Sequence, residues 1–169
     1  MFKVVIYFFI SIVLFIALTI TGAVTGAFFY IWPTSIPDQE LIVTKDTLAE
    51  LEHFRIKYKF GEEQKYDYPG AVDEASRLQL EQIVNILSKT LEVGLLANPN
   101  KSFVLLSFKK VLKHCSEFDS EDQDMILNYM EEIMVILKID SSNELLNVWR
   151  YGLPFGWFSS MPNRVAGGI

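Results

Sequence analysis

The residue types that carry nucleophilic or metal chemistry are scarce in this sequence. It has one cysteine, Cys115, and two histidines, His53 and His114. Zinc and other transition metals need several Cys or His side chains at ligand spacing. The two histidines fall on different predicted helices, and neighbours such as His114 and Cys115 point about 100° apart on a helix. We therefore expect no metal site, no cofactor and no catalytic residue among them, and a buried packing role for Cys115.

Two further patterns suggest chemistry only at first sight. Ser107 to Lys110 has the Ser-x-x-Lys spacing of penicillin-recognising enzymes, but their other two motifs are absent. Asp119 to Asp124 is rich in acids but lacks the central Gly and the closing Glu of a calcium loop. The acid pair Glu131-Glu132 is expected on a solvated helix face. We expect a non-catalytic protein; the alternative is an enzyme or small-molecule binder with a pocket between helices.

The N-terminal segment predicts a membrane anchor. Val4 to Trp32 contains no charged side chain, and about 20 apolar residues suffice to cross a bilayer as a helix. Tyr30 and Trp32 stand where an aromatic belt would meet the interface, and Pro33 ends the helix. The sequence thus predicts a transmembrane anchor over residues 1–33.

A cleaved signal peptide is the alternative for this segment. Small residues offer cut sites that would leave a soluble domain beginning at Val24 or Phe28. For the uncleaved anchor, Lys3 on one side and Asp38 on the other place the N-terminus in the cytoplasm by the positive-inside rule. The domain would then lie on the outer side of the membrane; for the bacterial source that the resemblance described below implies, this is the periplasmic side of the inner membrane.

Gly22 and Gly26 form a GxxxG pair within the anchor. Small residues four apart let two helix backbones approach closely, so these glycines are candidates for helix packing and for a homodimer. Glycine is also common in membrane helices without such a role.

The charge of the remaining chain limits its partners. Of the 15 Lys and Arg only Lys3 precedes Asp38, and none of the 21 Asp and Glu does, so the part from Asp38 onward carries −7. This argues against nucleic-acid binding, which needs a basic surface, and equally against adhesion of the domain to an anionic leaflet. An acidic domain favours basic partners, or simply solubility.

Hydrophobic periodicity predicts a helical bundle over residues 47–152, after a linker at 34–46. Apolar residues recur at helical spacing in each predicted helix, and strand-type alternation is absent at length. We predict capping boxes at Thr47, Ser120 and Ser141, a cap at Ser102, and an end of the first helix at Gly61. The fold class is all-α: one transmembrane helix followed by a compact bundle of about five helices.

The tail, residues 153–169, is aromatic and contains several glycines. Phe155, Trp157 and Phe158 are candidates for binding a partner or the membrane interface, where Trp is favoured. The alternative is that these side chains fold back onto the bundle and complete its core.

The segment from Phe118 to Gly152 resembles the C-terminal signature of a small helical bacterial family of unknown function. The matching residues are Tyr129, Glu132, Ile133, Met134, Ser141, Ser142, Leu146, Asn147, Trp149, Tyr151 and Gly152. Tyr68-Pro69-Gly70 is similar to that family's loop. The resemblance extends over about Leu48 to Gly152 and implies an all-α fold and a bacterial source, but no activity.

Together these observations predict a single-pass membrane protein whose helical domain binds another protein. One version is an immunity-type protector that covers a basic toxin. Another is an accessory subunit that docks through Gly22 and Gly26.

Overall fold

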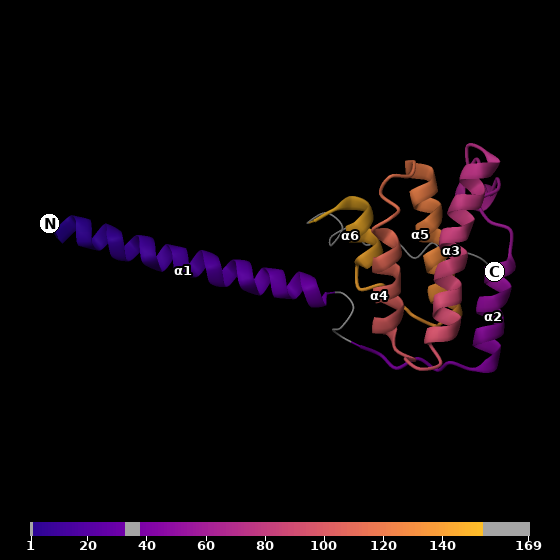
Figure 1. Cartoon of the computed structure of the whole chain (residues 1–169), viewed down its shortest axis with the longest axis horizontal. Helices are drawn as coiled ribbons and strands as arrows, with labels where there is room; N and C mark the ends of the chain where they lie inside the picture. Colours follow the sequence, from indigo (N-terminus) through magenta and orange to yellow (C-terminus); the bar gives the residue numbers. More distant parts are fainter. Residues whose placement is uncertain (1, 33–37, 154–169) are drawn as a thin grey trace.

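The computed structural model of the chain describes residues 2–32 and 38–153, and the regular elements in these ranges are all helices. The helices are α1 (Phe2–Ile31), α2 (Lys45–Ile56), the short 3-10 helix η1 (Gln64–Tyr66), α3 (Glu74–Gly94), α4 (Lys101–Leu112), α5 (Ser120–Ile136) and α6 (Leu145–Tyr151). Within these ranges there is no β-strand. Figure 1 shows α1 projecting away from the bundle that the other helices form. The predicted all-α fold, an apolar helix followed by a bundle, is confirmed.

Helix α1 is long and apolar enough, from Ile6 to Phe28, to cross a membrane, and none of that span is buried inside the chain. A signal sequence would have the same properties. Two of its hydroxyl groups bond within the helix: Ser11 donates to the carbonyl of Tyr7 and Thr19 to that of Phe15, at 2.9 and 3.0 Å. Internal bonds of this kind suit a helix surrounded by lipid, where no water is available.

The bundle core is built from the apolar stripes that periodicity predicts. Helix α3 contacts α2, α4 and α5, so it lies at the centre of the domain. The stripe of α3 is almost fully buried: Leu80, Val84, Leu87, Leu91 and Leu95. The stripe of α5 is buried as well: Ile126, Tyr129, Met130, Ile133, Met134 and Leu137. These two predictions are confirmed.

The ends of α2 differ from the sequence prediction. Thr44, not Thr47, is the N-cap: its Oγ1 accepts from the Thr47 backbone N–H at 3.1 Å, and the Thr47 hydroxyl accepts from the Thr44 N–H at 3.3 Å. The box is therefore Thr44 with Thr47, three residues earlier than predicted. The helix also ends at Ile56 rather than at Gly61.

The start of α4 is fixed by the segment that follows α1. Asn100 is the N-cap, so the prediction of Ser102 as the cap is wrong. The carboxylate of Asp38 instead accepts from the Ser102 N–H at 2.9 Å and from its hydroxyl at 2.8 Å. Backbone bonds from Leu41 to Pro99 and from Lys101 to Gln39 hold the same segment. Residues 38–41 are thus attached to the bundle.

Neither of the two other predicted capping boxes forms. The side-chain amide of Gln123 donates to the Phe118 carbonyl at 2.8 Å instead of returning to Ser120. Helix α6 is preceded by Glu144 in a left-handed conformation, with φ 64°, and no side chain caps its start.

Candidate functional site

Two open hollows lie next to each other where α5 meets α2 and η1. The smaller, of about 280 Å³, is lined by Lys65, Tyr66, Asn128, Glu131, Glu132, Val135 and Ile136. The larger, of about 670 Å³, is lined by Asp46, Ala49, Glu50, His53, Phe54, Lys57, Glu132 and Ile136. Because Glu132 and Ile136 line both, the hollows form one surface, which we call the α2–α5 groove.

Glu132 lies at the centre of the α2–α5 groove. Its carboxylate accepts from the Tyr66 hydroxyl at 3.4 Å and pairs with the Lys57 ammonium at 3.5 Å. One helix thereby binds both the end of α2 and the loop that contains η1. Glu131 and Glu132 are half-buried rather than fully solvated as predicted. Lys57 is exposed, so the ion pair stays open to water and contributes at most about 1 kcal/mol.

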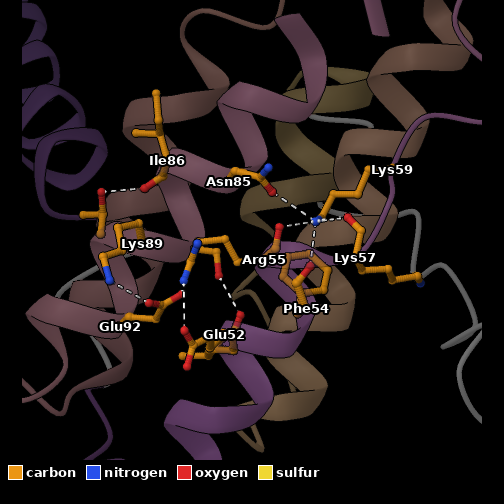
Figure 2. A network of polar contacts seen from close by, with 12 residues as sticks. Glu52, Phe54, Arg55, Lys57, Lys59, Asn85, Ile86, Lys89 and Glu92 are labelled. Atoms are coloured by element: carbon orange, nitrogen blue, oxygen red, sulfur yellow. Dashed lines mark hydrogen bonds and ion pairs between the residues drawn. The ribbon is translucent and has the colours of Figure 1, made fainter. Parts of the chain in front are cut away.

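Lys59 is a buried residue that contacts Phe54, one of the residues that line the groove. Its side chain is 1 % exposed, and its ammonium donates to the carbonyls of Phe54, Arg55 and Lys57 and to the side-chain oxygen of Asn85, at 2.6 to 3.0 Å. Figure 2 shows the ammonium at the meeting point of these four acceptors. Burial lowers its pKa to about 8. Lys59 thus closes the C-terminal end of α2 by bonding its last carbonyls.

The Lys59 ammonium also fixes one wall of the groove. It lies 4.7 Å from the centre of the Phe54 ring, a cation–π distance. On the neighbouring turn, Arg55 bonds Glu92 of α3 at 2.6 Å and Glu52 at 3.3 Å (Figure 2). The bond between Arg55 and Glu92 ties α2 to α3.

A buried acid that sequence analysis missed lies in α5 and bonds the loop beside the groove. Asp122, in the first turn of α5, is 8 % exposed and accepts from the Tyr68 hydroxyl at 2.5 Å. Burial and this bond raise the pKa of Tyr68 far above its usual range. Tyr129 accepts from the Phe60 N–H at 3.0 Å, and Phe60 has a left-handed φ of 60°. The two tyrosines hold a strained loop against α5.

Comparison with known proteins addresses this same part of the chain. A family model described as "Domain of unknown function (DUF4844)" matches residues 42–154. The chain belongs to this family. No curated protein and no solved structure matches it.

The DUF4844 match confirms the predicted membership of a small domain family of unknown function. It includes α2 to α6 and both hollows of the groove, whereas α1 lies outside it. The helix is therefore an addition to the shared domain. The predicted bacterial source stays a prediction.

Within the DUF4844 domain, the residues first considered for chemistry lie apart. Cys115 is fully buried after α4, its thiol bonds the Val111 carbonyl at 3.3 Å, and burial raises its pKa to about 11. His114 is exposed, and His53 is exposed at the edge of the groove. In the described ranges, no group of three or more Cys, His, Asp or Glu could hold a metal ion.

The candidate packing and partner-binding residues lie outside the groove. Gly22 and Gly26 are exposed on α1, and a Cβ added to either would meet no atom within 4 Å. Phe155, Trp157 and Phe158 lie outside the described residues. The groove itself was missed because its residues come from three separate elements; the one signal in the sequence is the tyrosine-rich loop at Tyr66 and Tyr68.

Proposed function

We propose that this protein is a membrane-anchored, non-catalytic binding module whose DUF4844 domain binds another protein through the α2–α5 groove. Helix α1 serves as an uncleaved single-pass anchor, with the N-terminus in the cytoplasm and the domain on the outer side. The partner segment that fits the groove is an amphipathic helix with basic residues. The observation that carries the proposal is the lining of the α2–α5 groove, which combines apolar side chains with four carboxylates.

Apolar side chains and acids share the lining of the groove. Phe54 is 4 % exposed and Ile136 is half-buried, while Val135 beside them is 53 % exposed. Four carboxylates line the two hollows, against two lysines: Asp46, Glu50, Glu131 and Glu132, against Lys57 and Lys65. The excess of negative charge matches the −7 of the domain and favours a basic partner.

The form and position of the groove support a macromolecular ligand. The larger hollow is open and the smaller one is partly enclosed, whereas small-molecule sites enclose most of the ligand surface. An amphipathic helix laid in an open apolar trough buries one face and leaves the other in water. Figure 1 shows α2 at the end of the bundle remote from α1, so an anchored domain would leave this face accessible.

Photo-crosslinking in the native host tests the proposal. A photoreactive phenylalanine analogue replaces His53 or Val135, which line the groove, or Ile86 as a matched control, 56 % exposed on α3. We expect adducts with one protein from the first two positions only, through a peptide rich in Lys or Arg. Reversing the rim charge with Glu50→Lys should reduce the adduct about tenfold, since one charge contact contributes about 1–2 kcal/mol.

Other outcomes contradict the proposal. Equal adducts from Ile86, or adducts unchanged by Glu50→Lys, would show that the groove is not the binding face. Absence of a protein adduct, together with a small molecule retained by the purified chain in native mass spectrometry, would favour the alternative of a small-molecule binder or enzyme.

A further inference from the structure

The end of α4 carries a cluster of lysines, in a segment of this acidic domain that contains no acidic residue. Between Glu92 and Glu117 the chain has no acidic residue but carries four lysines. Three of them, Lys109, Lys110 and Lys113, lie at the C-terminal end of α4, and we call this set the basic edge. Lys110 and Lys113 are exposed, and neither forms an ion pair within residues 2–32 and 38–153.

The basic edge is attached to the end of α1. The Lys109 ammonium donates to the Trp32 carbonyl at 2.9 Å. Trp32 is the last residue of the uncharged segment Val4 to Trp32, and aromatic residues at the end of a membrane helix lie at the level of the headgroups. The headgroup layer on each side of a bilayer is about 5–8 Å thick. With α1 in a membrane, Lys109 therefore lies at the level of the headgroups.

Helices α4 and α6 lie on the side of the bundle that is nearest to α1 (Figure 1). Figure 1 shows α1 approaching the bundle where α4 and α6 lie. The Trp149 indole of α6 donates to the Leu112 carbonyl at 3.0 Å, which fixes α6 against the end of α4. Leu106, 41 % exposed, is one helical turn before Lys110 and on the same face. An exposed leucine beside lysines is the composition of a surface that meets lipid headgroups.

The charges of Lys109 and Lys113 repel each other. Burial, and then the charge of Lys113, lower the pKa of Lys109. The negative end of the α4 helix dipole offsets part of this charge, but it adds no charged partner for the exposed Lys110 and Lys113.

We propose that the basic edge binds the anionic phospholipid headgroups of the bilayer that α1 spans, so that the domain rests on the membrane with α4 and α6 against it. The proposal depends on the membrane anchoring proposed above. It concerns a different surface from the α2–α5 groove, and the two can fail separately.

The test measures which face of the domain lies near the lipid. The full chain, in a Cys115→Ala background, is reconstituted in nanodiscs of phosphatidylcholine alone or mixed with phosphatidylglycerol. A fluorophore is attached after Leu106→Cys, or after Ile86→Cys as the control on α3, and lipids with a headgroup nitroxide quench it. We expect stronger quenching at position 106 than at 86, and only in discs that contain phosphatidylglycerol.

Charge reversal then identifies the cause. Lys110→Glu with Lys113→Glu should reduce the quenching at position 106 at least about threefold, because each lysine near an anionic surface raises association on the order of fivefold. High salt should act in the same direction. Circular dichroism checks that the variant keeps its helices. Equal quenching in neutral and anionic discs, or quenching unchanged by the reversal, would overturn the proposal.

A label at Val13 separates this result from a failure of the anchor. Val13 lies within the apolar span, so a fluorophore introduced with Val13→Cys should be quenched by nitroxides on the acyl chains. If it is not, α1 does not span the bilayer, and the anchoring and the basic edge proposal are both overturned. If it is, the signal at position 106 decides the basic edge alone.

Discussion

Lys59 illustrates how single residues set the properties of this domain. A buried ammonium is costly unless oxygen acceptors surround it, and here three carbonyls and Asn85 do so. Arg77 adds a second layer: its guanidinium donates to the Lys59 carbonyl at 3.2 Å and pairs with Glu74 and Glu81. These bonds provide partners for the buried polar groups of Lys59 and Arg77 that join α2 to α3.

The low pKa of Lys59 predicts a specific dependence of stability on pH. Its pKa is about 8 in the folded protein, against 10.5 for an ordinary lysine. Between these values the unfolded chain binds more protons, so the contribution of Lys59 to the free energy of unfolding rises as pH increases through this window and is smallest below it. Lys59→Met should cost about 1–3 kcal/mol near neutral pH, because three carbonyls lose their donor.

Urea unfolding in detergent micelles at about pH 7 and about pH 10 measures this effect. We expect wild type to gain on the order of 1 kcal/mol over Lys59→Met at the higher pH. Lys89→Met is the matched control, because Lys89 is exposed and pairs with Glu92 only at the surface; its difference from wild type should not change. A constant difference for Lys59→Met would contradict the low pKa.

Periodicity could not predict these buried polar groups. It assigns polar residues to the solvated side of a helix. Asp122 lies at a predicted helix start, Lys59 near the predicted end of the first helix, and Tyr68 in a predicted loop. Their burial depends on partners distant in the sequence, such as Tyr68 for Asp122. For the same reason Glu132 was expected in solvent, although Lys57 and Tyr66 bind it within the groove.

At the scale of the helices, the interiors were predictable and the ends were not. An apolar stripe repeats over several turns and so averages out local exceptions, which explains why the cores of α3 and α5 follow the prediction. A cap depends on one bond, and Ser, Thr and Asp are frequent near every helix start. The cap that Asp38 provides to Ser102 joins residues 64 apart, so no local pattern contains it.

The difference between the predicted and the observed caps can be measured. Thr44→Ala removes the acceptor for the Thr47 N–H and should lower the free energy of unfolding by about 1 kcal/mol. Ser120→Ala should change it by less than about 0.5 kcal/mol, because the Ser120 hydroxyl bonds only the adjacent Glu121 side chain. Urea unfolding of the two variants provides the comparison. A larger loss of unfolding free energy for Ser120→Ala than for Thr44→Ala would support the capping box that the sequence predicts at the start of α5.

On the scale of the whole molecule, two surfaces of opposite charge lie on different sides of the bundle. Helix α3 lies between them, in contact with both α2 and α4. The acidic α2–α5 groove is remote from α1, while the basic edge bonds the end of α1. A domain held on a bilayer by its basic edge would present the groove to the aqueous side, so the two proposals are compatible in one orientation.

The last prediction concerns association of the whole chain through α1. A Cβ at Gly22 or Gly26 would meet no atom of the chain within 4 Å, so Gly22→Leu with Gly26→Leu should leave the folded monomer unchanged. Close packing of two α1 helices would be blocked by the new side chains. We expect wild type to dimerise in micelles and the variant to dissociate at least about tenfold more readily, a difference of about 1.4 kcal/mol. Analytical ultracentrifugation measures both.

Val24→Leu is the matched control, since Val24 is 64 % exposed and lies on another face of α1. A monomeric wild type, or a dimer that Val24→Leu weakens as much as the glycine changes do, would show that the GxxxG pair has no packing role, and any partner of this protein would then have to be recognised by the helical domain alone.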